Sequence, residues 1–449
     1  MGKALDWITG KSWQADRSVL PNGRLVRGIT LLAGGAALGQ VISFLASTVL
    51  TRLYSPNDFG IFGVFISLLG LVAVIASLSY EYAIPIPEDD ETAADILGLC
   101  FLVLLIMNLL LWATVYAFGD QISTWFNAPE SKYYLWLLPF GMFAAGTYRI
   151  LNYWAIREKN YKIIGKTQLI RAITAASIKI CMACLVSGPI GLLSGQLGAE
   201  IAGISSLWTA AWEKDNAFFR AINLQRIQKA AKKFKDFPIY VGLSSVIDAL
   251  GTNVPQILFA IFYGPEIVGW FVLAQQIIGA PMNIIVSSVD QVYFGEIAQL
   301  SRNNPHAIKR LFIKMTKKLA LLEGLPVLLI FFSAPWIFKT VFGLDWEMAG
   351  RYAQFLVLMF SVRFTVIPLQ NTLYTIFRQN LFVPWTSIKL IMAAGSILLG
   401  HVMGFPVNTI IAGYSLSMSL AYIILWVIIW RELNKACNYE DRKENRLKF

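Results

Sequence analysis

Long apolar runs recur along the whole chain, and short polar segments separate them. A run of about 20 apolar residues is long enough to cross the hydrocarbon core of a bilayer as a helix. The pattern therefore predicts an all-α integral membrane protein with twelve transmembrane helices, over residues 29–50, 59–80, 96–118, 134–156, 167–187, 191–212, 238–262, 269–291, 318–338, 351–373, 381–402 and 407–430.

The composition favours the same fold class. Apolar residues make up 56% of the 449-residue chain, charged residues make up 14%, and the mean hydropathy is +0.58. These values are far from those of a soluble domain. Residues 1–28, which precede the first run, have no apolar core, so a cleavable signal peptide is not expected.

The positions of the lysines and arginines predict the orientation, because positively charged loops are retained on the cytoplasmic side of a membrane. With the amino terminus inside, 31 of the 38 lysines and arginines lie in cytoplasmic segments and four lie in outer loops. We therefore expect both termini and the basic connector 213–237 to be cytoplasmic. Topology and contact with phospholipid then explain the net charge of +11, and no nucleic-acid partner is expected.

Three short patterns occur twice, in the same order. YSPNDFGIF (54–62) is matched by YGPEIVGWF (263–271), and both would form an outer turn that opens a helix. Chance similarity among apolar sequences could explain any one pair, but three pairs in order favour an internal repeat. The other two pairs are YWAIREKN (153–160) with YTIFRQN (374–380), and TQLIRAITAA (167–176) with TSIKLIMAA (386–394).

The repeat predicts two pseudo-symmetric halves of six helices each, related by an axis along the membrane normal. Such repeats are typical of secondary transporters that alternate access between two lobes. The expected domains are a cytoplasmic segment, a first half, the basic connector, a second half and a cytoplasmic tail, over residues 1–28, 29–212, 213–237, 238–430 and 431–449.

Sequence patterns of enzymes and metal sites are not found. His306 and His401 are the two histidines, and no HExxH, GxSxG or P-loop pattern occurs. Cys181 and Cys184 form a CxxC without a second ligand pair nearby, so we interpret them as buried helix-packing residues. We expect neither an enzyme nor a metal site.

Polar residues within the predicted helices gather on single helical faces. Gln40 belongs to such a stripe on the first helix, Asp248 to one on the seventh, and Gln276 and Asn283 to one on the eighth. Stripes of this kind either line a watery cavity or join helices through polar contacts. The sequence pattern allows both interpretations.

Ionisable residues are costly within a bilayer, so they usually face a cavity or one another. Cations that face a cavity would favour an anionic substrate. We therefore predict a substrate site formed by Arg363, Lys179, Lys389, Arg149, Gln40, Gln276 and Asn283.

The acids of the predicted helices allow other roles. We interpret Asp248 and Glu200 as candidates for coupling to an ion, a proton or a sodium ion, with no other cofactor. Two alternatives are structural: Glu200 would neutralise Lys179 from the neighbouring helix, and Asp248 would bond across to the eighth or first helix. Arg149 and Glu323 lie close enough to the inner surface for their charged groups to reach it.

Several segments, taken in order, resemble the bacterial polysaccharide flippases of the multidrug/oligosaccharidyl-lipid/polysaccharide exporter superfamily. Ser79 stands where members of that family often have arginine. The similar segments are LTRLYSPNDFGIFGVFISL (50–68), SYEYAIPIPEDDETAADI (79–96), FKDFPIY (234–240), YGPEIVGWFVLAQQIIGAPM (263–282) and VFGLDWEMAGRYAQFL (341–356).

The resemblance implies a transporter of the bacterial inner membrane that flips a lipid-linked oligosaccharide to the outer leaflet. The carrier lipid would be undecaprenyl diphosphate, the product a surface polysaccharide such as O-antigen or exopolysaccharide, and the partners a polysaccharide polymerase and a chain-length regulator. One alternative is a multidrug exporter of the same superfamily, whose substrates are mostly cationic. Another is a membrane polysaccharide polymerase or glycosyltransferase, although no outer loop long enough for a catalytic domain is predicted.

Overall fold

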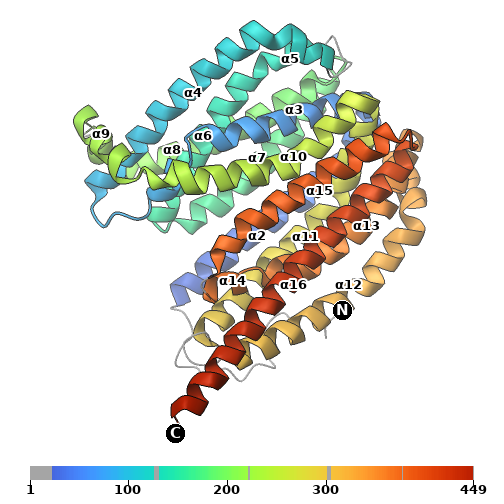
Figure 1. The fold of residues 1–449 in the computed structure, drawn as a ribbon. Helices are drawn as coiled ribbons and strands as arrows, with labels where there is room; N and C mark the ends of the chain where they lie inside the picture. The colour runs from blue at the N-terminus through green and yellow to red at the C-terminus, as the bar shows by residue number, and fades with distance from the viewer. Residues whose placement is uncertain (1–22, 126–130, 221–222, 301–304, 377, 448–449) are drawn as a thin grey trace.

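The computed structural model describes residues 23–125, 131–220, 223–300, 305–376 and 378–447 (Figure 1). Residues 1–22 of the predicted amino-terminal segment lie outside that range. Across the described residues the chain is helical, with no strand. The helices of 20 residues or more are α2 (Gly23–Leu53), α3 (Pro56–Ile75), α4 (Asp90–Trp125), α6 (Leu137–Arg157), α7 (Tyr161–Ala183), α8 (Ile190–Arg220), α10 (Leu243–Tyr263), α11 (Pro265–Leu300), α12 (Pro305–Phe342), α13 (Glu347–Val366), α15 (Phe382–Val402) and α16 (Val407–Leu447).

Each of these long helices coincides with one predicted apolar run. Within the described part of the chain, nine segments are long and apolar enough to cross a membrane, and the protein is a multi-pass membrane protein. The helices α6, α7 and α8 are not among the nine. Their lower hydropathy reflects the polar and charged residues that they carry, such as the four cations of α7.

Two helices end earlier than their apolar runs predict. The run 59–80 is helical only to Ile75, because Leu78 and Ser79 adopt positive φ values of 49° and 64° and turn the chain. A short 3₁₀ helix, η2 (Tyr80–Ala83), follows. The run 351–373 leaves the α-helix at Val366, just before Pro368, because proline lacks the backbone N–H that a helix needs. The 3₁₀ turn η5 (Ile367–Leu369) and the single helical turn α14 (Thr372–Thr375) complete it.

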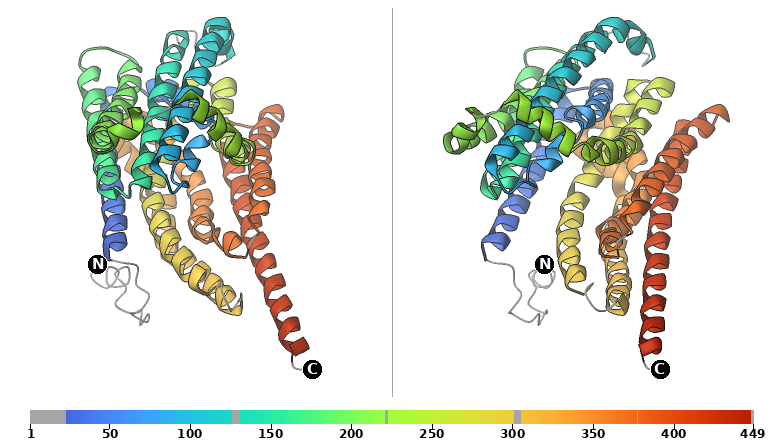
Figure 2. Two further views of the ribbon diagram at one scale, coloured as in Figure 1. Left: turned by 90° about the vertical axis from the view of Figure 1, so that its left-hand side faces the viewer. Right: turned by 60° about the vertical axis from the view of Figure 1, so that its left-hand side comes forward.

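The long helices pack as two groups (Figures 1 and 2). In the group α2–α8, which we call the amino-terminal lobe, α7 lies between α2 and α8, and α6 packs against α4 and α8. In the group α10–α16, the carboxy-terminal lobe, α13 lies between α12 and α16, and α15 lies between α10 and α16. The main contact between the lobes is that of α3 with α10 and α11.

The repeated turn forms the closest point of that contact. A Cβ atom on Gly60 of α3 would collide with the carbonyl oxygen of Pro265, and one on Gly269 of α11 would collide with the carbonyl oxygen of Pro56. The two contacts are reciprocal, since each glycine lies four residues after the proline that opens its own helix. Glycine is therefore required at both positions for the two backbones to touch.

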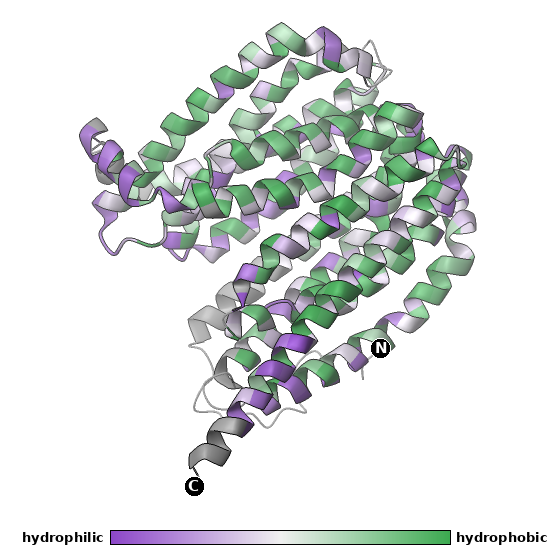
Figure 3. Ribbon diagram, viewed as in Figure 1, coloured by the Kyte–Doolittle hydropathy of each residue, from purple (hydrophilic) through white to green (hydrophobic). Residues whose placement is uncertain are grey.

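Hydrophilic residues gather at the other end of the molecule. They cover α9 (Leu224–Lys233), the turn before α4 and the last turns of α16, whereas apolar residues follow the long helices (Figure 3). Ile227 and Ala230 of α9 are buried, and Arg226 forms ion pairs with Glu91 and Asp95 of α4 at 2.7 and 3.2 Å. The α9 helix thus lies along this hydrophilic end of the amino-terminal lobe, which we call the inner end because the charge pattern of the sequence predicts that it faces the cytoplasm.

Candidate functional site

A central cavity of about 510 Å³ opens between the lobes. Most of its walls come from the carboxy-terminal lobe, through α10, α11, α13, α15 and α16, and Gln40 of α2 closes the opposite side. The structure brings six of the predicted site residues together in its walls: Gln40, Asp248, Gln276, Asn283, Arg363 and Lys389.

Arg363 is positioned by α13 and faces this cavity. Its guanidinium donates a long hydrogen bond of 3.4 Å to the Asn283 side-chain oxygen and lies 5.8 Å from the ring centre of Phe360. Among the described residues no carboxylate lies within ion-pair distance of it, so its charge is neutralised by no acid of that part of the chain. A planar guanidinium with free donors suits bidentate contact with phosphate or carboxylate.

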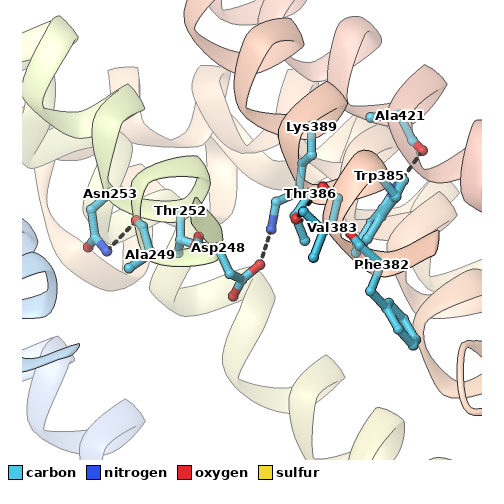
Figure 4. Close-up of polar contacts among 10 residues, drawn as sticks. All are labelled: Asp248, Ala249, Thr252, Asn253, Phe382, Val383, Trp385, Thr386, Lys389 and Ala421. Atoms are coloured by element: carbon cyan, nitrogen blue, oxygen red, sulfur yellow. Dashed lines mark hydrogen bonds and ion pairs between the residues drawn. The ribbon is translucent and has the colours of Figure 1, made fainter. Parts of the chain in front are cut away.

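Asp248 and Lys389 form an ion pair across α10 and α15, with 2.6 Å between the carboxylate and ammonium groups (Figure 4). The lysine side chain is 8% exposed and the aspartate side chain 56%. The aspartate therefore faces the cavity, while the lysine stem packs against Gly251 and its ammonium group lies 5.4 Å from the ring centre of Trp385. The predicted hydrogen bond from Asp248 to the eighth or first helix is wrong, because Asp248 instead pairs with Lys389 of α15.

The amides of the polar stripes both line the cavity and join helices. Gln276 donates to the Ser47 hydroxyl at 3.3 Å and so links α11 to α2 across the two lobes. Gln256 donates to the Gln275 side chain at 2.8 Å, and Ser67 of α3 donates to Gln256. The same residues therefore line the cavity and join helices through polar contacts.

A second cavity, of about 550 Å³, continues from the first toward the inner end of the molecule. Both cavities share Asp248, Thr252, Gln370 and Trp385. We call the second one the inner cavity. Its walls include the inner turns of α3, α10 and α15, together with η2 and α14.

Arg149 lines the inner cavity, and its charge is neutralised within its own lobe. Its Nε lies 2.8 Å from Glu81, and it also donates to the Tyr82 hydroxyl at 3.0 Å. Glu81 is fully buried and accepts a 2.6 Å hydrogen bond from Ser77. The turn at Leu78 and Ser79, where the chain leaves the predicted helix, directs Glu81 toward Arg149.

Lys179 and Glu200 line neither cavity. The predicted pair between them is wrong, because Glu200 bonds to Arg171, whose guanidinium stacks 4.0 Å from the Tyr148 ring centre. The helices α7 and α8 are antiparallel, so Arg171 is level with Glu200, and Lys179 lies one to two turns away, beside Gly195. The Lys179 ammonium lies 4.5 Å from the ring centre of Phe62.

Other interpretations of single residues also change. Glu323 is buried between α12 and α13 and accepts a 2.9 Å hydrogen bond from Thr365, so it does not extend to the inner surface. Cys181 and Cys184 are exposed rather than buried, because that face of α7 is not covered by a neighbouring helix.

Aromatic side chains were not predicted as part of the site. Tyr414 and Tyr422 of α16 and Trp385 of α15 line the central cavity, and the Trp385 indole is fixed by its 3.0 Å hydrogen bond to the Ala421 carbonyl. In the sequence they are indistinguishable from the apolar residues of a membrane helix. Their place in the wall depends on the packing of α15 against α16.

Similarity to known proteins is broad but distant. The sequence is 20% identical to the succinoglycan biosynthesis transport protein ExoT of Rhizobium meliloti over 70% of this chain. It is 23% identical to the teichuronic acid biosynthesis protein TuaB of Bacillus subtilis over 68% of this chain. The aligned region covers 62% of the length of each relative.

Solved structures share the fold. An inward-facing multidrug resistance transporter of the MATE family aligns with a TM-score of 0.68 at 14% identity, covering 90% of this chain and 96% of that one. The lipid II flippase MurJ, in an inward closed conformation, aligns with a TM-score of 0.66 at 15% identity, covering 91% and 90%.

The family itself is shown by sequence. A family model described as polysaccharide biosynthesis protein matches residues 49–350, about two thirds of the chain. The match includes the repeated turn and all residues of α10 and α11 that line the central cavity, Asp248 among them. The resemblance drawn from the sequence motifs is thereby confirmed, and the chain belongs to the polysaccharide biosynthesis protein family.

Proposed function

We propose that this protein flips a lipid-linked oligosaccharide, carried on undecaprenyl diphosphate, from the inner to the outer leaflet of the bacterial inner membrane. The observation that carries the proposal is Arg363, a cation without a carboxylate partner among the described residues, in the wall of a cavity between two lobes. A diphosphate group supplies the negative charge and the oxygen acceptors that this guanidinium lacks. Membership of a polysaccharide biosynthesis family supports a glycan as the cargo.

The transport cycle that we propose is alternating access. All twelve long helices would span the membrane, with both termini and the basic connector on the cytoplasmic side. In this orientation the contact of the lobes through Gly60 and Gly269 would be at the outer end, and the cavities would lie on the cytoplasmic side of that contact. An enzyme has no place in the proposal: the protein would supply the glycan to a separate polysaccharide polymerase and chain-length regulator.

A multidrug exporter is the alternative that shares this fold. Its mostly cationic substrates would meet the guanidinium of Arg363, and the one carboxylate that the described residues place in this cavity wall, Asp248, is already paired with Lys389. Like charges at close range repel each other, and the repulsion is stronger beside protein than in bulk water. The charge of the central cavity therefore favours an anionic substrate.

The test is to remove the charge of Arg363 in cells that depend on this protein for surface polysaccharide. Arg363→Ala should abolish surface polysaccharide, and Arg363→Lys should restore it only in part, because an ammonium group lacks the planar fork of donors. The lipid-linked intermediate should accumulate in the inner leaflet. Arg351→Ala is the matched control, since Arg351 lies on the same helix but is exposed and pairs with Glu347 at 3.2 Å.

Normal surface polysaccharide in Arg363→Ala, at normal protein level, would remove the substrate-binding role. Export of cationic dyes that depends on this protein, and that persists in Arg363→Ala, would favour the multidrug alternative instead.

A further inference from the structure

The two cavities differ in charge. In the central cavity the Arg363 guanidinium has no carboxylate partner in the part of the chain that the structure describes. In the inner cavity each charged side chain is already matched: Arg149 by Glu81 at 2.8 Å, and Asp248 by Lys389 at 2.6 Å. The inner cavity therefore offers a neutral polar surface.

The walls of the inner cavity combine aromatic rings with uncharged polar groups. Tyr82 of the amino-terminal lobe faces the cavity from one side, and Tyr374 and Phe382 of the carboxy-terminal lobe line the other. The rings of Tyr374 and Phe382 lie with their centres 5.0 Å apart at an angle of 34°. Tyr374 is 50% exposed, although it lies next to the fully buried Leu373. A half-exposed aromatic ring in a cavity wall offers a flat apolar surface to a ligand.

Amide and hydroxyl groups surround these rings. Asn253 donates to the Ala249 carbonyl at 2.8 Å, which fixes its side chain and leaves the amide oxygen as an acceptor toward α3 (Figure 4). Asn371 is fixed in the same way by its 2.7 Å bond to Asp290. Gln370 lines both cavities at the point where they join. Side-chain amides carry both donors and acceptors, so they can bind hydroxyl groups in either sense.

Rings beside fixed amides match the chemistry of a carbohydrate. A pyranose ring has apolar C–H faces that pack on aromatic rings, and its hydroxyl groups at the edges need donors and acceptors together. A volume of about 550 Å³ is within the range of roughly 300–1,000 Å³ that is usual for ligand pockets. A second phosphate site is not favoured, because the cation of this cavity is already paired with a buried carboxylate.

We propose that the inner cavity is a glycan subsite, which binds the sugar units nearest to the diphosphate while the diphosphate itself lies in the central cavity. This assignment rests on the proposed function. The two cavities meet at Gln370 and Trp385, so a sugar attached directly to a phosphate at Arg363 would extend from one into the other. The subsite, rather than the cationic site, would then set which glycan is carried.

The test compares two probes on the purified full-length protein in lipid nanodiscs. One probe is undecaprenyl diphosphate, and the other is undecaprenyl diphosphate carrying the oligosaccharide that accumulates in cells lacking this transporter. The unaltered protein should bind the second probe more tightly. Tyr374→Leu should weaken binding of the glycan-bearing probe about fivefold to tenfold, the loss expected for one aromatic contact, and leave binding of undecaprenyl diphosphate unchanged.

Two control variants separate a binding role from a structural one. Tyr374→Phe keeps the ring and should retain tight binding of the glycan. Tyr116→Leu makes the same change as Tyr374→Leu at an exposed ring of α4, outside both cavities, and should alter neither affinity.

The possible failures are distinguishable. Equal affinity of the unaltered protein for the two probes, or an equal loss for both in Tyr374→Leu, would overturn the glycan subsite and leave the proposed transport of a lipid diphosphate intact. Failure of the unaltered protein to bind undecaprenyl diphosphate would overturn the proposed function, and the subsite with it.

Discussion

The two lobes treat their buried charges differently. In the amino-terminal lobe, Arg149 pairs with Glu81 and Arg171 with Glu200, and each pair is formed within the lobe. In the carboxy-terminal lobe, Arg363 has no carboxylate partner among the described residues, and Lys389 is held by an aspartate that faces the cavity. The amino-terminal lobe thus holds two matched pairs, with Lys179 against the Phe62 ring outside both cavities, whereas the carboxy-terminal lobe presents the Arg363 guanidinium to the central cavity.

This difference has a physical basis. A buried ion pair that is fully matched fixes the arrangement of its helices, and removal of one partner leaves an uncompensated charge. A cation that faces a watery cavity remains partly solvated, so its charge can be left for a ligand. Substitutions in the first lobe should therefore affect folding, and those in the second should affect transport.

The largest effect is expected from Glu81→Gln. It leaves Arg149 without a charged partner next to a fully buried site, and breaking such a pair costs about 3–5 kcal/mol. Little folded protein should accumulate in the membrane, as measured by size-exclusion chromatography of a fluorescent fusion. The double variant Glu81→Gln with Arg149→Gln should recover most of the protein. If Glu81→Gln accumulates and melts like the unaltered protein, the pair does not stabilise this lobe.

Much of the fold could be predicted from the sequence, since the twelve long helices coincide with the twelve apolar runs. The partners of the charged residues could not be predicted. The sequence pattern of one helix predicts which of its residues point in the same direction. It does not predict which helix packs opposite them, or which residues of that helix lie at the same height. Glu200 meets Arg171 because of the antiparallel register of α7 and α8, and Glu81 meets Arg149 because of a turn with positive φ at Leu78.

In the candidate site, too, some residues could be predicted from the sequence and others could not. Gln276 and Asn283 were found because polar residues are conspicuous in an apolar helix, and both line the central cavity. Tyr374 and Tyr422 were not singled out, because an aromatic residue in a membrane helix has the same pattern whether it faces lipid, core or cavity. The position of the two lobes relative to each other determines whether such a residue faces lipid, core or cavity. No short sequence pattern predicts that position.

The next largest effect concerns the contact that the two lobes share. Gly269→Ala places a methyl group against the Pro56 carbonyl, and overpacking of this kind typically costs about 1–3 kcal/mol. The outer ends of α3 and α11 should then separate, and a disulfide between cysteines introduced at Asn57 and Glu266 should form more slowly than in the glycine protein. Gly395→Ala is the control, because a Cβ there meets no atom within 4 Å. Equal rates of disulfide formation in both variants would contradict the backbone contact.

A smaller effect is expected at the cavity-facing acid of the second lobe. Asp248→Asn removes the carboxylate that neutralises Lys389 at the cavity wall, so a phosphate oxygen of the ligand can take its place beside the ammonium group. Undecaprenyl diphosphate should bind about fivefold more tightly, equivalent to about 1 kcal/mol, and transport should slow because release is hindered.

The same variant tests the proposed coupling of transport to an ion. If Asp248 takes up a proton or a sodium ion during the cycle, transport by Asp248→Asn in proteoliposomes should no longer respond to the gradient of that ion. An unchanged response to both gradients would exclude Asp248 as the coupling residue, and Glu200, held by Arg171 outside both cavities, would be no better candidate.

The smallest effect is expected at Asp89, which lies outside the membrane at the start of α4 in the amino-terminal lobe. The Asp89 carboxylate accepts a 2.8 Å hydrogen bond from the backbone N–H of Thr92, and the hydrogen bonds from Thr92 lower the pKa of Asp89 below its usual value. Asp89→Ala removes this helix cap and should lower the free energy of unfolding by about 0.5–1 kcal/mol. Because the folded pKa is depressed, the contribution is present above the unfolded pKa of about 3.9 and is lost as the pH falls through the lower folded value. Thermal melting of both proteins in detergent should therefore differ by a constant small amount from pH 7 to about pH 5, and the difference should narrow below about pH 4. A difference that persists unchanged at the lowest pH would show that Asp89 acts through its backbone turn and not through its charge.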